Sequence, residues 1–74
     1  MNGMINANLP KPNEIFRREI YAQLGKQRIA ARALGVSEGH LSSIINGWIS
    51  PGRELASRAS SLFGKPVHEL FPNL

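Results

Sequence analysis

The stretch that decides the fold is QRIAARALGVSEGHLSSIING, which runs from Gln27 to Gly47. Its first part carries apolar residues at helical spacing, at Ile29, Ala30, Ala33 and Leu34. Residues 35–37 interrupt this pattern, and a second periodic run follows, at Leu41, Ile44 and Ile45. Because apolar residues three and four positions apart share one face of a helix, the segment predicts two short helices joined by a sharp turn.

The residue types around the turn suit this geometry. Gly35 follows the first helix, where a left-handed backbone costs little for a residue without Cβ. Ser37 suits the N-cap of the second helix, because its hydroxyl can accept a backbone N–H, and the small Ala31 allows a close helix crossing. A plain helical hairpin can share any one of these features. Together they predict a helix-turn-helix, whose second helix enters the major groove of DNA.

Length and composition predict one small domain with a core that is only just sufficient, since the chain has 74 residues. There is no cysteine, so neither a disulfide nor a zinc–thiolate site can support the fold. The two histidines, His40 and His68, are far apart and lack a flanking ligand pattern. We therefore expect helix packing, helped by dimerisation, to stabilise the domain without a metal or another cofactor.

The charge of the chain favours a polyanionic partner. Nine Lys and Arg against five Asp and Glu give a net charge of +4, and neutralising phosphates releases counterions. An ordinary basic protein can have the same balance. No apolar run approaches the ~20 residues that span a membrane, and the N-terminus lacks the long apolar segment of a signal peptide. A cytoplasmic protein without membrane contact is expected.

Turn signals and apolar spacing divide the chain into an arm and one domain. Residues 1–12 are rich in Asn, Pro and Gly and predict a flexible arm, and residues 13–74 form the domain. Asn13 can cap a first helix that Gly25 ends. This helix has apolar residues every four positions, at Phe16, Ile20 and Leu24.

Two further helices are predicted after the Asn46-Gly47 turn signal. The fourth begins near residues 50–52 and ends at Gly64. Its predicted buried stripe is Leu55, Ala59 and Leu62, with Ala56 and Phe63 beside it. Pro66 opens a short last helix with one apolar face, formed by Val67, Leu70 and Phe71. Five helices and no strand candidate predict an all-α fold, a compact five-helix bundle.

Over Glu14 to Phe71, the chain resembles the phage repressor-like helix-turn-helix family, also called the Cro or XRE family. The most specific matching residues are Gln27, Ala31, Leu34-Gly35-Val36-Ser37, Leu41, Ile44 and Asn46-Gly47. The resemblance implies a repressor-like DNA-binding domain in a bacterial or phage transcription regulator that binds operators as a dimer. Lys26 departs from the family pattern, in which a Ser or Thr usually precedes the Gln that corresponds to Gln27. The helix that begins at Gln27 therefore loses a side-chain cap and gains a neighbouring cation. Gly39 stands at a position that often reads bases.

The residues expected to read bases lie on the second helix of the motif, opposite its apolar stripe. At about 100° per residue, they are Glu38, Gly39, Ser42, Ser43 and Asn46. Asn46 can pair with an adenine edge, the serines can bond to several bases, and Glu38 can accept from a cytosine amino group. The alternatives are solvated serines, a helix C-cap at Asn46, and an acid at Glu38 that suits the helix dipole.

Phosphate contacts are expected around this face. The resemblance implies that Gln27 hydrogen-bonds to the DNA backbone, and Lys26 and Arg28 flank it as cations. The expected set is completed by Ser37 and His40. Arg32, Arg53 and Arg58 are expected to face solvent. Lys11 gives the arm some attraction for phosphate.

The last helix and the tail are the expected dimer interface, because a terminal apolar patch needs cover. Its residues are Val67, Leu70, Phe71 and Leu74. The alternative role of these residues is the protein's own core. Trp48 is expected to cover the edge of the core, and a contact with a partner or with the DNA backbone is the alternative.

The function expected from these features is sequence-specific binding of double-stranded DNA by a homodimeric transcription regulator, a repressor. The alternative is a protein-interaction module, such as an antitoxin or an adaptor, which Trp48, Ile49 and the apolar tail suggest. No acid pair, histidine-based nucleophile or phosphate-cradling glycine loop is present, so neither an enzyme nor a small-molecule ligand is expected.

Overall fold

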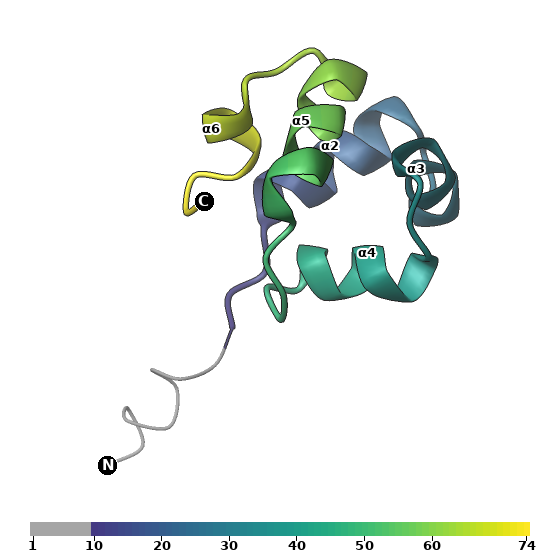
Figure 1. The fold of residues 1–74 in the computed structure, drawn as a ribbon. Coiled ribbons are helices and arrows are strands. Elements are labelled where there is room, and N and C mark those ends of the chain that lie inside the picture. Colours follow the sequence, from purple (N-terminus) through teal and green to yellow (C-terminus); the bar gives the residue numbers. More distant parts are fainter. Residues whose placement is uncertain (1–9) are drawn as a thin grey trace.

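The computed structural model describes residues 10–74, which contain five α-helices and no strand (Figure 1). The helices are α2 (Glu14–Gln23), α3 (Gln27–Leu34), α4 (Glu38–Ile45), α5 (Gly52–Phe63) and α6 (Val67–Leu70). The predicted all-α helical bundle is therefore confirmed. Residues 1–9 of the predicted arm lie outside the described residues.

The helices pack around α2, which contacts α3, α4 and α6. α3 and α4 are joined by a turn of residues 35–37, and α4 lies along the lower edge of the bundle in Figure 1. α5 packs against α3 and α6 on the opposite side. Only one side of α4 is therefore covered by the other helices.

The core joins all five helices around Phe16, whose side chain is fully buried. The Phe16 ring lies edge-on to Phe63, with 6.1 Å between ring centroids. The Phe16 ring also packs against the Phe71 ring, with 4.7 Å between ring centroids. These contacts connect α2 with the end of α5 and with the residue that follows α6. Burial of this apolar surface is the main stabilising term for so small a domain.

The buried stripe of α5 differs from the predicted one. Its buried residues are Leu55, Ala56, Ala59 and Phe63, and Leu62 is 37% exposed. The prediction for Leu62 is therefore wrong. The stripe runs at intervals of four residues from Leu55 to Phe63, because the ring of Phe63 packs against Phe16 and leaves its neighbour on the outside.

The buried face of α3 also differs in part from the periodic pattern. Ala30, Ala31 and Leu34 are buried, as expected for a closely crossing helix. Ile29 is 46% exposed, and Ala33 is exposed as well. The helix therefore packs through small side chains and one leucine, and its larger apolar residue faces solvent.

Two helix caps are confirmed. The side-chain oxygen of Asn13 accepts the N–H of Phe16 at 3.0 Å and begins α2. The hydroxyl of Ser37 accepts the N–H of His40 at 3.0 Å and begins α4. Gly35 ends α3 with a left-handed backbone at φ 77°. The turn between α3 and α4 is thus defined by a glycine on one side and a side-chain cap on the other.

Candidate nucleic-acid interface

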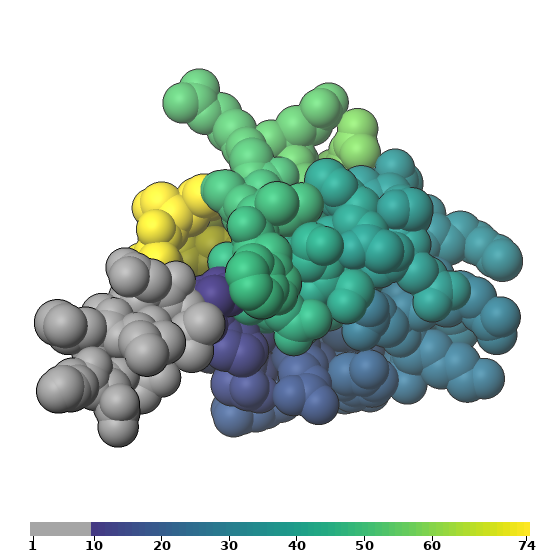
Figure 2. All heavy atoms as spheres, turned by 90° about the horizontal axis from the view of Figure 1, so that it is seen from below, coloured from purple at the N-terminus to yellow at the C-terminus, as the bar shows by residue number. Residues whose placement is uncertain are grey.

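The outer side of α4 carries the residues that were predicted to read bases. Leu41, Ile44 and Ile45 are buried beneath the helix. Glu38, Gly39 and Asn46 are exposed, and Ser42 and Ser43 are half-buried, so the predicted set lies opposite the buried stripe. Figure 2 shows the molecule from below, with α4 along the side that faces the viewer. This polar side is accessible along the length of the helix.

Asn46 stands at the C-cap of α4, which was one of the alternatives for it. Its Nδ2 donates to the Ser42 hydroxyl at 3.3 Å, one helical turn earlier. The bond connects two of the predicted base-reading residues. It orients the Asn46 amide group, while the side chain remains exposed to solvent.

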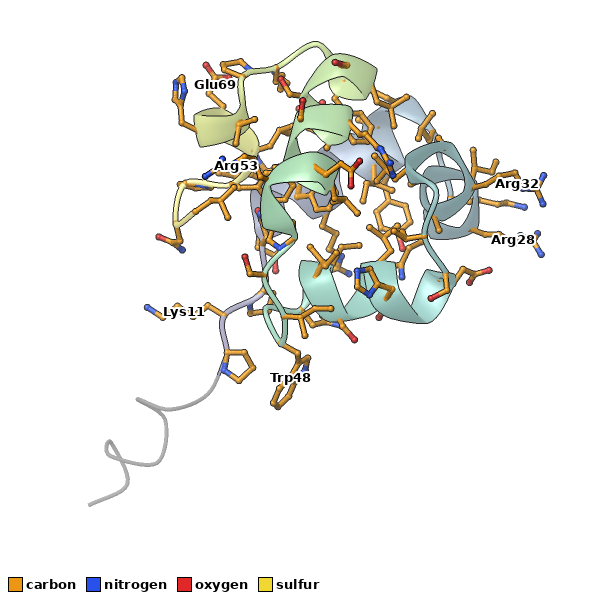
Figure 3. All side chains as sticks on the ribbon, viewed as in Figure 1. Lys11, Arg28, Arg32, Trp48, Arg53 and Glu69 are labelled. Atoms are coloured by element: carbon orange, nitrogen blue, oxygen red, sulfur yellow. The ribbon has the colours of Figure 1, made fainter. Side chains whose placement is uncertain are left out.

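Arg28 and Arg32 are the cations of α3, and Lys26 immediately precedes the helix. Arg28 and Arg32 point outward from α3 on one side of the molecule (Figure 3). Lys26 occupies the N-cap of α3 and makes no cap hydrogen bond through its side chain, as expected from the missing Ser or Thr. Gln27, which follows it, is half-buried.

The ion pairs of the described residues leave the cations of α3 unneutralised. These pairs join Glu14 to Arg17 at 3.6 Å, Glu54 to Arg58 at 3.3 Å and Glu19 to Lys65 at 3.6 Å. Within residues 10–74, the cations without an ion pair are Lys11, Arg18, Lys26, Arg28, Arg32 and Arg53. The positive charge near α4 is therefore available to an anionic partner.

Ser37 and His40, which were also predicted to contact phosphates, lie at the start of α4. The Ser37 oxygen is engaged in the α4 cap, although the residue is exposed and its hydroxyl hydrogen can still donate. His40 is exposed on the first turn of α4. Both residues are accessible next to the polar side of α4.

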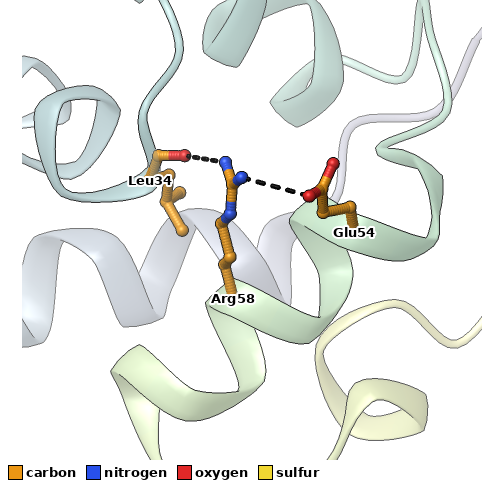
Figure 4. A network of polar contacts seen from close by, with 3 residues as sticks. All are labelled: Leu34, Glu54 and Arg58. Carbon is orange, nitrogen blue, oxygen red and sulfur yellow. Dashed lines mark hydrogen bonds and ion pairs between the residues drawn. The ribbon is translucent and has the colours of Figure 1, made fainter.

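Arg58 fixes the end of α3, a role that was not expected for it. Its Nη1 donates to the carbonyl oxygen of Leu34 at 3.1 Å, and its Nη2 donates to the Glu54 carboxylate at 3.3 Å (Figure 4). Arg58 is exposed to solvent, as expected, but it also binds the backbone at the end of α3. The spacing of Glu54 and Arg58 indicates an ion pair along the helix, but no sequence pattern indicates the carbonyl as the second acceptor.

The predicted dimer interface is buried in part within the protein's own core. Leu70 is fully buried, and Phe71 is 5% exposed because its ring packs against Phe16. Val67 is half-buried against the same cluster. The interface prediction is therefore wrong for Leu70 and Phe71, whose alternative role in the core is the one observed. Leu74 is exposed and remains accessible.

Trp48 does not cover the core. It follows the Gly47 turn at the end of α4 and is 67% exposed, and the next residue, Ile49, is 40% exposed. In Figure 3, Trp48 points away from the bundle below α4. The expected role in covering the edge of the core is therefore wrong, because the turn directs the ring outward.

The described residues show no group of three or more His, Cys, Asp or Glu side chains that could hold a metal ion. None of the helices found in residues 10–74 has the length and apolarity that crossing a membrane requires.

Comparisons with protein-family models, curated proteins and solved structures gave no match for this chain.

Proposed function

We propose that this protein is a sequence-specific regulator, a repressor, that binds double-stranded DNA by inserting α4 into the major groove. In this proposal α3 and α4 act as a helix-turn-helix of the phage repressor-like type. The observation that carries the proposal is that α4 has a polar, accessible side and packs against α3, whose cations Arg28 and Arg32 take part in no ion pair within residues 10–74.

The dimensions of α4 suit this role. An α-helix with its side chains is about 10–12 Å wide, and the major groove of B-DNA is about 12 Å wide. Because α4 is covered on one side only, its outer side can enter the groove without unfolding the bundle. Asn46, oriented by Ser42, has the acceptor and donor that match an adenine edge.

The charge distribution supports contacts to the phosphates that flank the groove. Lys26 and Arg28 are exposed and take part in no ion pair among the described residues. Each can neutralise one phosphate and release its counterions. These contacts position the protein on DNA, and the residues of α4 select the sequence.

The proposal includes a homodimer, which would place two copies of α4 in successive major grooves about 34 Å apart. Because Leu70 and Phe71 belong to the core, accessible residues must form the interface, and the half-buried Val67 and the exposed Leu74 remain from the predicted set. The protein acts without enzymatic chemistry or a cofactor, and it works in the cytoplasm, where DNA of the proposed bacterial or phage type is located.

A protein-interaction module, such as an antitoxin or an adaptor, is the second candidate. The exposed apolar side chains of Trp48, Ile49 and Leu74 favour it, because exposed apolar surface often marks a protein interface.

Selection of duplexes from a random pool tests the proposal. The full chain is compared with a Ser42→Ala/Asn46→Ala double variant and a Lys26→Ala/Arg28→Ala double variant, with Arg53→Ala as the charge control. We expect an enriched palindromic site for the full chain and for the control. The first double variant should lose sequence preference, and the second should bind all sequences more weakly. Failure to enrich any site, with negligible DNA binding at physiological salt, would contradict the proposal and favour a protein partner.

A further inference from the structure

The end of α4 and the segment that leads into α2 form one continuous surface. The N–H of Asn13 donates to the carbonyl oxygen of Ile45 at 2.6 Å. Gly47 has a left-handed backbone at φ 83°, and a Cβ at this position would overlap the backbone of Lys11. These contacts hold Lys11 next to the turn from which Trp48 projects.

A hollow of about 430 Å³ opens at this surface. Its polar lining includes Lys11, Ser50 and Asn73, and its apolar lining includes Trp48, Ile49 and Leu74. No acidic side chain is found among the described residues that line it, and Lys11 has no ion-pair partner in residues 10–74. The surface therefore presents a free cation and hydrogen-bond donors beside an exposed aromatic ring.

This combination matches the sugar–phosphate backbone of a nucleic acid. A phosphate supplies the negative charge and the acceptor oxygens, which suit Lys11 and the Ser50 hydroxyl. The neighbouring sugar supplies a less polar surface against which an indole ring can pack. An apolar small molecule would leave the ammonium group of Lys11 without a partner.

The position of the surface relative to α4 favours DNA over a protein. Arg28 and Arg32 lie at the end of α4 where the turn from α3 arrives, and Lys11 and Trp48 lie at the other end (Figure 3). Trp48 also points to the same side of the molecule as the outer side of α4. A helix in the major groove has a phosphate backbone on each side, so cations are needed at both ends of α4.

We propose that Lys11 and Trp48 form a second contact with the DNA backbone, at the end of α4 opposite the cations of α3. Lys11 neutralises one phosphate, Ser50 donates to it, and Trp48 packs against the adjacent sugar. This inference rests on the proposed function, because α4 must lie in the groove for the contact to form.

The first test uses the fluorescence of Trp48, which is the only tryptophan in the chain. The full chain is titrated with a short duplex of mixed sequence. The anisotropy of a dye on the DNA measures binding, and acrylamide quenching measures the accessibility of Trp48. We expect quenching to decrease at the same duplex concentrations at which the anisotropy rises. A parallel dilution series without DNA measures protection by a second copy of the chain.

The second test compares variants with matched controls. Lys11→Gln should lower the slope of log affinity against log salt by about 0.9 and weaken binding about fivefold at about 0.15 M salt. Arg53→Gln removes one exposed cation from α5 and should leave both values unchanged. Trp48→Ala should weaken binding to all sequences, and Trp48→Phe should restore most of the loss. Tyr21→Ala, which removes an exposed aromatic ring from α2, should have no effect.

The outcomes distinguish this inference from the proposed function. If the anisotropy does not change, the proposed function itself is wrong. If the duplex binds but Trp48 stays accessible and Lys11→Gln keeps the salt slope of the unmodified chain, only the second backbone contact is wrong. Protection of Trp48 that depends on protein concentration alone also overturns it, because the ring is then covered by a second copy.

Discussion

The side chain of Asn13 donates from Nδ2 to the carbonyl oxygen of Leu70 at 2.7 Å, across 57 positions of the sequence. The same side chain accepts the N–H of Phe16 and caps α2. The Asn13 amide therefore uses its oxygen for the start of α2 and its nitrogen for the end of α6. One side chain connects the beginning of the described domain with its last helix.

We expect Asn13→Ala to destabilise the protein by about 2 kcal/mol, because it removes a helix cap and a partly buried hydrogen bond that contribute about 1 kcal/mol each. Asn13→Ser keeps a capping oxygen and loses the donor to Leu70, so it should cost about 1 kcal/mol. Urea denaturation followed by circular dichroism measures both values. Equal losses in the two variants would show that the cap contributes nothing.

Replacing Arg58 tests its hydrogen bond to Leu34. We expect Arg58→Met, which keeps most of the aliphatic stem, to destabilise the protein by about 1 kcal/mol because the carbonyl of Leu34 loses a donor. Glu54→Gln removes only the ion pair on the helix surface and should change the stability by less than about 0.5 kcal/mol. Thermal unfolding compares the two. A larger effect of Glu54→Gln would mean that the ion pair is the stabilising interaction.

Two glycines provide a matched pair of substitutions. Gly47→Ala should destabilise the protein by more than about 1 kcal/mol, because its backbone is left-handed and the new methyl group would overlap the backbone of Lys11. Gly39→Ala places a methyl group in open space within α4 and should stabilise the protein by about 0.5–1 kcal/mol. Denaturant midpoints measure both changes. Similar effects of the two substitutions would contradict the close packing of Lys11 on Gly47.

The uncapped start of α3 predicts opposite effects on stability and DNA binding. Lys26→Ser supplies the missing cap and should stabilise the protein by about 1 kcal/mol. It also removes a cation, so the slope of log affinity against log salt should fall by about 0.9 under the proposed function. Lys26→Ala is the control, because it removes the cation and adds no cap. If Lys26→Ser leaves the salt slope unchanged, Lys26 does not contact a phosphate.

The exposed Leu62 and its buried neighbour Phe63 test the corrected stripe of α5. Phe63→Ala removes a ring that packs against Phe16 and should cost about 3–5 kcal/mol, which is enough to unfold much of so small a domain. Leu62→Ala should cost far less, because the side chain is more than one third exposed. Circular dichroism at room temperature and thermal melts compare the variants. Comparable losses would support the stripe predicted from the sequence.

Periodicity and caps were sufficient to predict the helical fold. Asn13, Gly35 and Ser37 lie at helix ends because their side chains, or the absence of one, act within a few residues. Local effects of this kind can be recognised in the sequence. The sequence does not show which of Leu62 and Phe63 is buried, because both side chains are large and apolar. The position of Phe16 in the folded protein decides between them.

The residues on the outer side of α4 could be predicted from the sequence, because they follow from helix geometry. The outer side of α4 depends only on the phase of the helix and on its buried residues. The bond from Arg58 to Leu34 was not predictable, because every residue carries a carbonyl oxygen and its partner is set by tertiary packing. The exposure of Trp48 depends on the direction of a turn, and the burial of Phe71 depends on a ring that lies 55 positions earlier, Phe16.

The Arg58 bond means that the segment from Gln27 to Gly47 is not autonomous. An excised peptide of this segment would lose the Arg58 donor at Leu34 and the Asn13 donor at Ile45. Its two helices have eight residues each, well below the length at which isolated helices persist in water, about 12–15 residues. Grafting the motif into another protein would therefore require α5 and the lead-in to α2 to be transplanted with it.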